Sequence, residues 1–471
     1  MRQFLHKISA QRVVVPGKAQ PFEVETSPVR SRSWNRLSLA LVVLVVLLAL
    51  AAGWASSSLA DASLRRDFGV IAAAAIFAWS YAALAIGRIP GLALDRAGIA
   101  LVGAALMVAC SALPLDQAYA AIDLDTLTLL LGMMIVVANL RISGFLPLAT
   151  AFITGRAHRP LALLAAITAV AGVLSAFLVN DAICLVMTPL VIELARSSRR
   201  NPVPYLLAVA MASNVGSTAT IIGNPQNMMI GSFSQIPYAN FAAALAPIAG
   251  IGLVLTFMLI ALCHASEFAG GKLLEPSIPT AAIDRATGFR ALAGTAILLV
   301  LLFIGQPPAK AAIVIGALLL LTRRVKSDRI YSEIDWSLLL MFAGLFIIVT
   351  GAERTLLNGN LEVAVASLHL DRVPALSGLT AFLSNVVSNV PAVLLLEPFV
   401  TRLPDQRSAW LTIAMASTLA GNFTVIGSIA NLIVVQGAAA NRIAIGFWDY
   451  FRVGAPLTLL TLTVGTLWLW L

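Results

Sequence analysis

Long stretches of apolar residues constrain the fold of this chain more than any other feature of its sequence. About 20 apolar residues in a helix cross the hydrocarbon core of a membrane. Backbone polar groups have no water partners there, so such stretches must be helical. Only 11% of the residues are charged and 59% are hydrophobic, whereas a soluble domain has about 25% charged residues. The sequence therefore predicts an all-α polytopic membrane protein with about 11 transmembrane helices.

Basic residues cluster at the ends of the apolar stretches. The 31 Lys and Arg residues give a net charge of +9, and this pattern is typical of cytoplasmic loops rather than of nucleic-acid binding. When the N-terminus is placed in the cytoplasm, Arg96 and Arg141 fall inside, and the acidic turn 116–125 falls outside. The C-terminus then lies outside. We expect a multi-pass protein of the cell (inner, cytoplasmic) membrane, with the lipid bilayer as a partner and no nucleic acid.

One apolar stretch is too long for a single crossing. Residues 160–195 have basic residues at both ends and contain Asn180-Asp181 in the middle. A helix of this length would measure roughly 54 Å, against a hydrocarbon core of about 30 Å. Two full spans would place Asn180-Asp181 at the far surface, but no hydrophilic loop flanks them. We predict a re-entrant hairpin over about 160–196 and a second one, entering from the other side, over about 374–402.

The two halves of the chain contain a repeat. AMASNVGSTATIIGNPQN (Ala210–Asn227) aligns without a gap with AMASTLAGNFTVIGSIAN (Ala414–Asn431). The charge pattern gives the two copies opposite orientations, which is the inverted-repeat plan of secondary transporters with a site near the midplane. The predicted organisation is a basic, disordered cytoplasmic tail (1–36), two halves (37–262 and 289–471), a cytoplasmic linker (263–288), and broken helices at about 204–233 and 408–436.

Both copies are interrupted by glycine or proline and are rich in hydroxyl and amide groups. A broken helix exposes free N–H groups at one end and free carbonyls at the other, which suit an anion or a neutral oxyacid and a cation respectively. Such small residues also allow close helix packing, but their recurrence in both halves favours a site. The predicted substrate- and ion-binding residues are Asn180, Asp181, Ser213, Asn214, Ser217, Thr218, Thr220, Asn224, Asn227, Ser384, Asn385, Ser388, Asn389, Thr424 and Asn431.

Asp181 is the one acid at a hairpin tip, and Val390 occupies the equivalent place in the other half. An ionisable residue inside a membrane indicates a functional site, so we expect Asp181 to couple transport to H+ or Na+. The alternative is that Asp181 caps the second arm of the hairpin. We predict no cofactor, metal or catalytic residue, because paired acids, metal-spaced histidines and nucleophile motifs are missing from the spans. No nucleotide-binding motif is present either, so ATP coupling would require an ATPase subunit.

The chain resembles the ion-transporter superfamily in its arsenite permease and sodium/proton antiporter (ArsB/NhaD-like) branch, with a citrate-transporter-like domain. The resemblance rests on Asn180-Asp181 followed by Pro189, on SNVGSTATIIGNPQN (213–227), and on SNVVSNV (384–390). It implies a homodimer, a scaffold, and a mobile unit made of the hairpins and broken helices that moves like an elevator. The branch often has Gly-Asp-Pro-Pro-Asn where this chain has Gly-Asn-Pro-Gln-Asn (223–227), so one potential cation ligand is neutral.

The predicted function is secondary transport of a small inorganic anion or oxyacid such as arsenite, driven by an ion gradient. The alternatives are a citrate or dicarboxylate transporter, or a sodium/proton antiporter, of the same fold. An intramembrane enzyme is the competing class, and the sequence offers no catalytic constellation for it.

Overall fold

The computed structural model describes residues 51, 62–87, 94–146, 157, 159–269, 285–322, 324–356 and 368–471. The predicted tail (1–36), the apolar residues 37–50 and 52–55, and most of the predicted linker lie outside these residues. All secondary-structure elements within these residues are helices. Seven helices are long and apolar enough to cross a membrane, and several shorter apolar helices accompany them. The prediction of an all-α polytopic membrane protein is confirmed.

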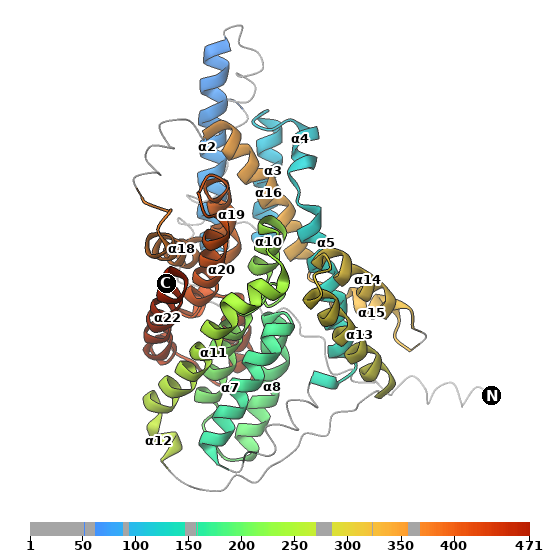
Figure 1. The fold of residues 1–471 in the computed structure, drawn as a ribbon, viewed down its shortest axis with the longest axis vertical. Coiled ribbons are helices and arrows are strands. Elements are labelled where there is room, and N and C mark those ends of the chain that lie inside the picture. Colours follow the sequence, from blue (N-terminus) through green and yellow to red (C-terminus); the bar gives the residue numbers. More distant parts are fainter. Residues whose placement is uncertain are drawn as a thin grey trace, which may run out of the picture.

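The first half begins with several helices, which precede a hairpin and an interrupted helix. Its elements are α2 (Ala62–Ile86), α3 (Arg96–Ala109), α4 (Leu115–Ala121), α5 (Leu124–Ile142), α7 (Pro160–Phe177), α8 (Asn180–Ser197), α9 (Pro202–Ser217), α10 (Pro225–Ser234), α11 (Tyr238–Cys263) and α12 (Ala265–Phe268). Helices α7 and α8 form the first hairpin, whose arms extend toward the bottom of Figure 1. Helices α9 and α10 form the first interrupted helix.

The second half repeats this order. Its elements are α13 (Arg285–Phe303), α14 (Pro308–Leu320), α15 (Ser327–Tyr331), α16 (Trp336–Leu356), α18 (Val373–Val387), α19 (Asn389–Val400), α20 (Gln406–Ala420), the 3-10 helix η1 (Val425–Gly427), α21 (Ile429–Ala440) and α22 (Phe447–Trp470). Helices α18 and α19 form the second hairpin, and α20 and α21 form the second interrupted helix. The two hairpins and two interrupted helices agree with the prediction.

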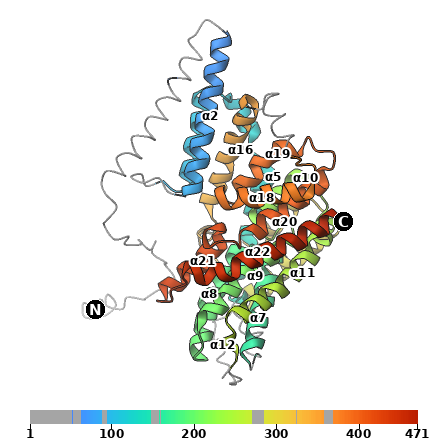
Figure 2. The same ribbon diagram turned by 90° about the vertical axis from the view of Figure 1, so that its left-hand side faces the viewer.

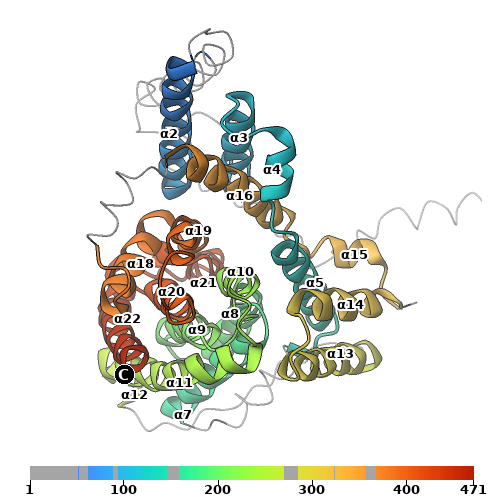
Figure 3. The same ribbon diagram turned by 45° about the horizontal axis from the view of Figure 1, so that its top comes forward.

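The helices separate into two groups, which Figure 3 shows side by side. We call α2–α5 with α13–α16 the arc, and α7–α12 with α18–α22 the cluster. The cluster combines the hairpin and interrupted helix of both halves. The final helices of the two halves, α11 and α22, pack against each other along one side of it (Figure 2). Each half therefore contributes to both groups.

The arc is held together by two equivalent close contacts. A Cβ added at Gly132 of α5 would lie 2.5 Å from the carbonyl carbon of Ala312 in α14, and one added at Gly344 of α16 would lie 2.7 Å from that of Ala100 in α3. Glycine permits this approach because it has no Cβ. Gly132 and Gly344 are equivalent in the repeat, so their partners Ala312 and Ala100 are equivalent too.

Two equivalent asparagines hold the interrupted helices. Asn227 Nδ2 donates to the carbonyls of Ser217 (3.2 Å) and Thr220 (3.0 Å), and Asn431 Nδ2 donates to those of Gly421 (2.8 Å) and Thr424 (3.2 Å). A helix end leaves backbone carbonyls without intrahelical partners. The asparagine amides bind these carbonyls, and so the same residue stabilises the same break in both halves.

Candidate functional site

A cavity lies where the two hairpin tips meet between the cluster and the arc. Four helices begin at its wall: α8 at Asn180, α10 at Pro225, α19 at Asn389 and α21 at Ile429. The arc closes the other side. The remaining lining residues are Leu84, Arg96, Asp181, Gln226, Leu338, Met341, Val387, Ser388, Val390, Pro391 and Ser428. We call this space the central cavity.

Helix N-termini direct unused backbone donors at the central cavity. In the described part of the chain, the N–H groups of Gln226, Asn389, Val390 and Ile429 have no hydrogen-bond partner. The positive end of the helix dipole and free N–H groups together favour an anion. The central cavity can therefore bind negative charge without a metal.

The second hairpin also has acceptors that are not satisfied. Ser384 Oγ, Asn385 Oδ1 and Asn389 Oδ1 are buried and have no hydrogen-bond partner among the described residues. Burying a polar group without a partner costs about 1–3 kcal/mol, so such groups indicate a missing ligand or ordered water. An amide oxygen accepts a hydrogen bond or binds a cation. Of the three residues, Asn389 lines the central cavity and Asn385 lines the adjoining one. The central cavity is therefore suited to a ligand with both acceptors and hydroxyl donors, or to an anion with a cation.

Asn214 links the first hairpin to the second half of the chain. Its Oδ1 accepts hydrogen bonds from Asn180 Nδ2 (3.1 Å) and Ser428 Oγ (3.0 Å). Its Nδ2 lies 2.9 Å from both Asn422 Oδ1 and Asn431 Oδ1. All five residues are buried. This side chain fixes the first tip relative to the opposite broken helix.

Thr418, the repeat equivalent of Asn214, makes the reciprocal contacts. It accepts from Asn224 Nδ2 (3.1 Å) and Gln226 Nε2 (3.2 Å) and donates to Asn227 Oδ1 (3.4 Å). The two broken helices thus exchange hydrogen bonds across a pseudo-two-fold axis. Thr418, Gln226, Asn422 and Ser428 belong to the hydroxyl- and amide-rich interruptions but are not among the predicted binding residues. The ungapped alignment of Asn214 with Thr418 is the signal that would have added Thr418.

Several predicted residues lie in the core of the cluster and not on the central cavity. Ser213 Oγ donates to the Ala210 carbonyl (2.9 Å), and the hydroxyls of Ser217 and Thr218 donate to the Asn214 carbonyl (2.9 and 3.2 Å). The Thr220 hydroxyl donates to the Ala176 carbonyl in the first hairpin. The carbonyl of Thr424 accepts from Asn431. These groups connect the helices that carry the tips.

Asp181 lies between two cavities. It lines the central cavity, and it lines a neighbouring one together with Arg141, Glu333 and Asp335. Arg141 forms an ion pair with Glu333, and no described residue donates a hydrogen bond to the Asp181 carboxylate. The N-cap residue of α8 is Val179, whose side chain makes no hydrogen bond to the helix. Asp181 therefore makes no capping hydrogen bond, but it lies in the first turn of α8, where an acid suits the helix dipole. Its carboxylate is open to a proton or cation.

Arg96 is a charged residue of the central cavity that sequence reasoning used only as a marker of topology. It begins α3, in the arc, and lines both the central cavity and an adjoining one. Nothing in the sequence distinguishes it from other basic residues at helix ends. Its role depends on α3 facing the hairpin tips, which is a tertiary contact.

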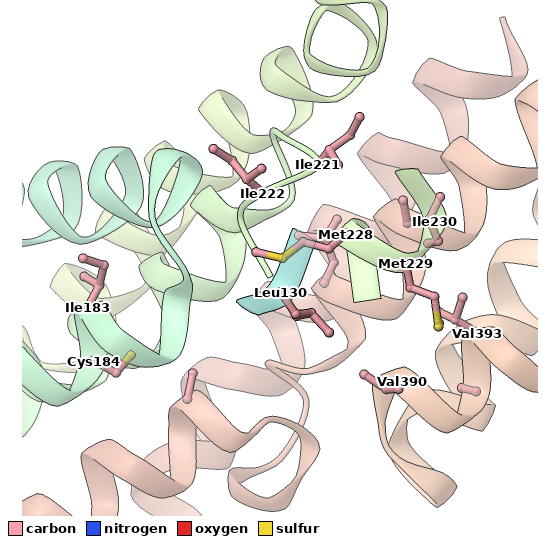
Figure 4. Packing of buried hydrophobic residues seen from close by; sticks show 14 of the residues in the cluster. Leu130, Ile183, Cys184, Ile221, Ile222, Met228, Met229, Ile230, Val390 and Val393 are labelled. Carbon is pink, nitrogen blue, oxygen red and sulfur yellow. The ribbon is translucent and has the colours of Figure 1, made fainter. Parts of the chain in front are cut away.

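Apolar side chains surround this polar centre. Figure 4 shows Met228 and Met229 of α10, with Leu130 of α5 and Val393 of α19 nearby. All of these side chains are almost fully buried. Within the described residues, no group of three or more His, Cys, Asp or Glu side chains could hold a metal ion.

Comparison with known families gives a match to the citrate transporter (CitMHS) family model over residues 74–420. The chain belongs to this family. That membership confirms the resemblance to the ArsB/NhaD-like branch of the ion-transporter superfamily, and it identifies the protein as a membrane transporter.

Two of the relatives and a similar solved structure are named as transporters. The silicon efflux transporter LSI3 of Oryza sativa subsp. japonica is 29% identical over 80% of this chain and 93% of the relative. The putative transporter arsB of Dictyostelium discoideum is 23% identical over 79% of this chain and 87% of the relative. A crystal structure of the YdaH transporter of Alcanivorax borkumensis covers 85% of this chain and 97% of its own, with a TM-score of 0.53 and 13% identity. This structure shares the fold.

Proposed function

We propose that this transporter carries a small inorganic anion or oxyacid, such as arsenite, driven by an ion gradient. The observation that carries this proposal is the convergence of four helix N-termini on the central cavity, with free N–H groups on three of them. Helix N-termini attract negative charge, and the effect is larger where water is excluded.

The unpartnered acceptors favour a ligand that also carries hydroxyl groups. Asn389 Oδ1 can accept a hydrogen bond from a protonated oxyacid, while the N–H groups of Asn389 and Ile429 donate to its oxygens. The names of two relatives, a silicon efflux transporter and a putative transporter arsB, refer to elements that form such acids. They support this substrate class for the present chain.

A carboxylate such as citrate or a dicarboxylate is the second candidate. The family description names citrate, and the Arg96 guanidinium could pair with a carboxylate in a bidentate manner. Sodium/proton antiport is a third possibility for the same fold. It would use Asp181 but would leave the anion-binding N-termini without a ligand.

Coupling is assigned to Asp181, with H+ or Na+ as the driving ion. The carboxylate lies at a tip and faces two cavities, so it can exchange an ion with one of them while the substrate occupies the other.

The transport cycle we infer is elevator-like. The cluster moves against the arc and carries the tips with it, and two chains associate as a homodimer in the cell membrane. The N-terminus is cytoplasmic and the C-terminus outside in this proposal.

Flux measurements in proteoliposomes test the proposal. Purified protein is reconstituted, and uptake and efflux of arsenite, phosphate, sulfate and citrate are measured under imposed proton or sodium gradients. We expect one class of substrate to accumulate against its own gradient only when one ion gradient is present. Flux of all four without dependence on either gradient would rule out secondary active transport. Accumulation of citrate alone would favour the second candidate.

A further inference from the structure

Arg96 differs from the other polar residues of the central cavity in belonging to the arc. The two tips and the starts of α10 and α21 all belong to the cluster. Among the residues that line the central cavity, Arg96 and Asp181 are the charged ones. The wall of the central cavity thus contains a cation from the arc and an acid from the cluster, and Arg96 shares the adjoining cavity with the arc residues Asp95 and Asp335.

The guanidinium of Arg96 lies against the end of α2 and has no ion-pair partner among the residues that the structure describes. A Cβ added at Gly87 would lie 3.5 Å from Arg96 Nε and 3.7 Å from Nη2. In the described part of the molecule, the ion pairs are Arg141–Glu333 and Arg200–Glu267, and no hydrogen bond involves the Arg96 side chain. A half-buried arginine among membrane helices is costly unless it pairs with another group. A bound anion can reach Arg96 through the central cavity.

The internal repeat shows that this charge is not duplicated. Arg96 lies four residues before Ala100, and Pro308 lies four residues before Ala312, the equivalent alanine that packs on Gly132. Pro308 is therefore the counterpart of Arg96. The next cation, Lys310, follows two residues later and is exposed, and residues two apart do not share a helix face. At the central cavity the arc therefore has a cation at the Arg96 end and none at the Pro308 end. Arg141, the arc cation beside Asp181 in the neighbouring cavity, is paired with Glu333.

We propose that Arg96 is the counter-charge of an anionic substrate and that it makes the present arrangement the higher-affinity state of the transport cycle. This inference rests on the proposed function. When the cluster carries the tips away from α3, the anion loses Arg96 and finds no cation at the equivalent place near Pro308. The affinity is then greater on the face where Arg96 lies, which is cytoplasmic in the proposed orientation. That asymmetry suits capture of the anion from inside.

The experiment compares flux from each face of the membrane. Half-saturating concentrations of phosphate, citrate and arsenite are measured in proteoliposomes of defined orientation. Arsenite is largely uncharged at neutral pH. The variants are Arg96→Gln, Arg96→Lys and, as the matched control at the other end of the arc, Lys310→Gln. For the transported anion, Arg96→Gln should raise the half-saturating concentration at the Arg96 face about ten-fold or more, and less than about two-fold at the opposite face.

Further arms separate binding from folding. Arsenite flux through Arg96→Gln should stay near the wild-type value, Arg96→Lys should restore part of the anion affinity, and Lys310→Gln should match the wild type. Equal shifts at both faces, or no shift, would overturn the inference. Loss of arsenite flux together with anion flux would overturn it as well, because that result would mean that Arg96 stabilises the end of α2 and does not bind the anion. A wild type that carries arsenite but neither anion overturns this inference alone. A wild type without flux of any of the three overturns the proposed function too.

Discussion

Two asparagines perform the same task in the two halves of the molecule. Asn227 and Asn431 each bind two backbone carbonyls at the break of a helix. A buried carbonyl that loses its partner costs about 1–3 kcal/mol. These residues therefore stabilise the broken helices, and through them the position of the tips. They contribute to the site by holding its walls and not by lining the central cavity.

Replacing Asn227 with alanine should lower stability. Two buried carbonyls, those of Ser217 and Thr220, would lose their donor, and we expect a loss of about 2–4 kcal/mol in unfolding free energy. The measurement is the thermal midpoint of purified protein in detergent. Asn441→Ala, at a half-buried helix end with one such bond to Gly437, is the control and should change the midpoint less. Equal midpoints for both variants would contradict this assignment.

Asp181→Asn should remove coupling to the ion gradient and leave the fold intact. The carboxylate accepts no hydrogen bond from described residues, so an amide of the same size breaks no contact. We expect substrate exchange to persist while accumulation driven by the proton or sodium gradient falls to the level of empty liposomes. Glu193→Gln, on the same helix but away from the tip, is the control. Gradient-driven accumulation that survives in Asp181→Asn would exclude the role.

How far the sequence predicts the site can be judged at single residues. The positions of Asn180, Asp181 and Asn389 at the tips follow from an interrupted apolar stretch with basic ends, and the structure places all three on the central cavity. Ser213 and Thr220 also lie in a polar, interrupted stretch of the sequence, but their hydroxyl groups donate to backbone carbonyls in the core. Polar residue type alone does not distinguish these uses. Arg96 could not be found because only packing brings α3 to the tips.

At the scale of elements, hairpin and broken helix act as one unit in each half. A Cβ at Gly216 of α9 would lie 2.0 Å from the Gly172 carbonyl oxygen of α7. The backbone N–H of Asn180 donates to the Gly223 carbonyl (3.0 Å). These contacts place the first tip against the break of the following helix. The repeat, the hairpins and the breaks were predictable from spacing, whereas this docking depends on shape.

Gly216→Ala should separate the hairpin arm from the broken helix. The added methyl group meets backbone atoms of Gly172, which cannot move aside, and overpacking of this kind costs about 1–3 kcal/mol or more. We expect a lower thermal midpoint and loss of flux. Gly250→Ala in α11 is the matched control, because a Cβ there meets nothing within 4 Å. A wild-type midpoint and flux in Gly216→Ala would show that the close approach is not required.

At the scale of the whole molecule, the cluster and the arc meet through few polar contacts. Ser232 of α10 donates to both carboxylate oxygens of Asp123 at the start of α5 (3.1 and 3.0 Å), and Tyr81 Oη donates to the Pro391 carbonyl (3.2 Å). Around them the contact is largely apolar. In the proposed cycle the substrate moves with the cluster, because both tips belong to it and the arc supplies the opposing wall.

A reversible link between the two groups tests this account most directly. Cysteines replace Asp123 and Ser232, whose side chains are in contact, in a protein in which the exposed Cys263 is changed to serine. Mercury ions then bridge the pair, and single-cysteine variants serve as controls. Substrate flux in proteoliposomes should fall to the background with mercury and return when a thiol reductant removes it. Undiminished flux in fully bridged protein would contradict movement of the cluster against the arc.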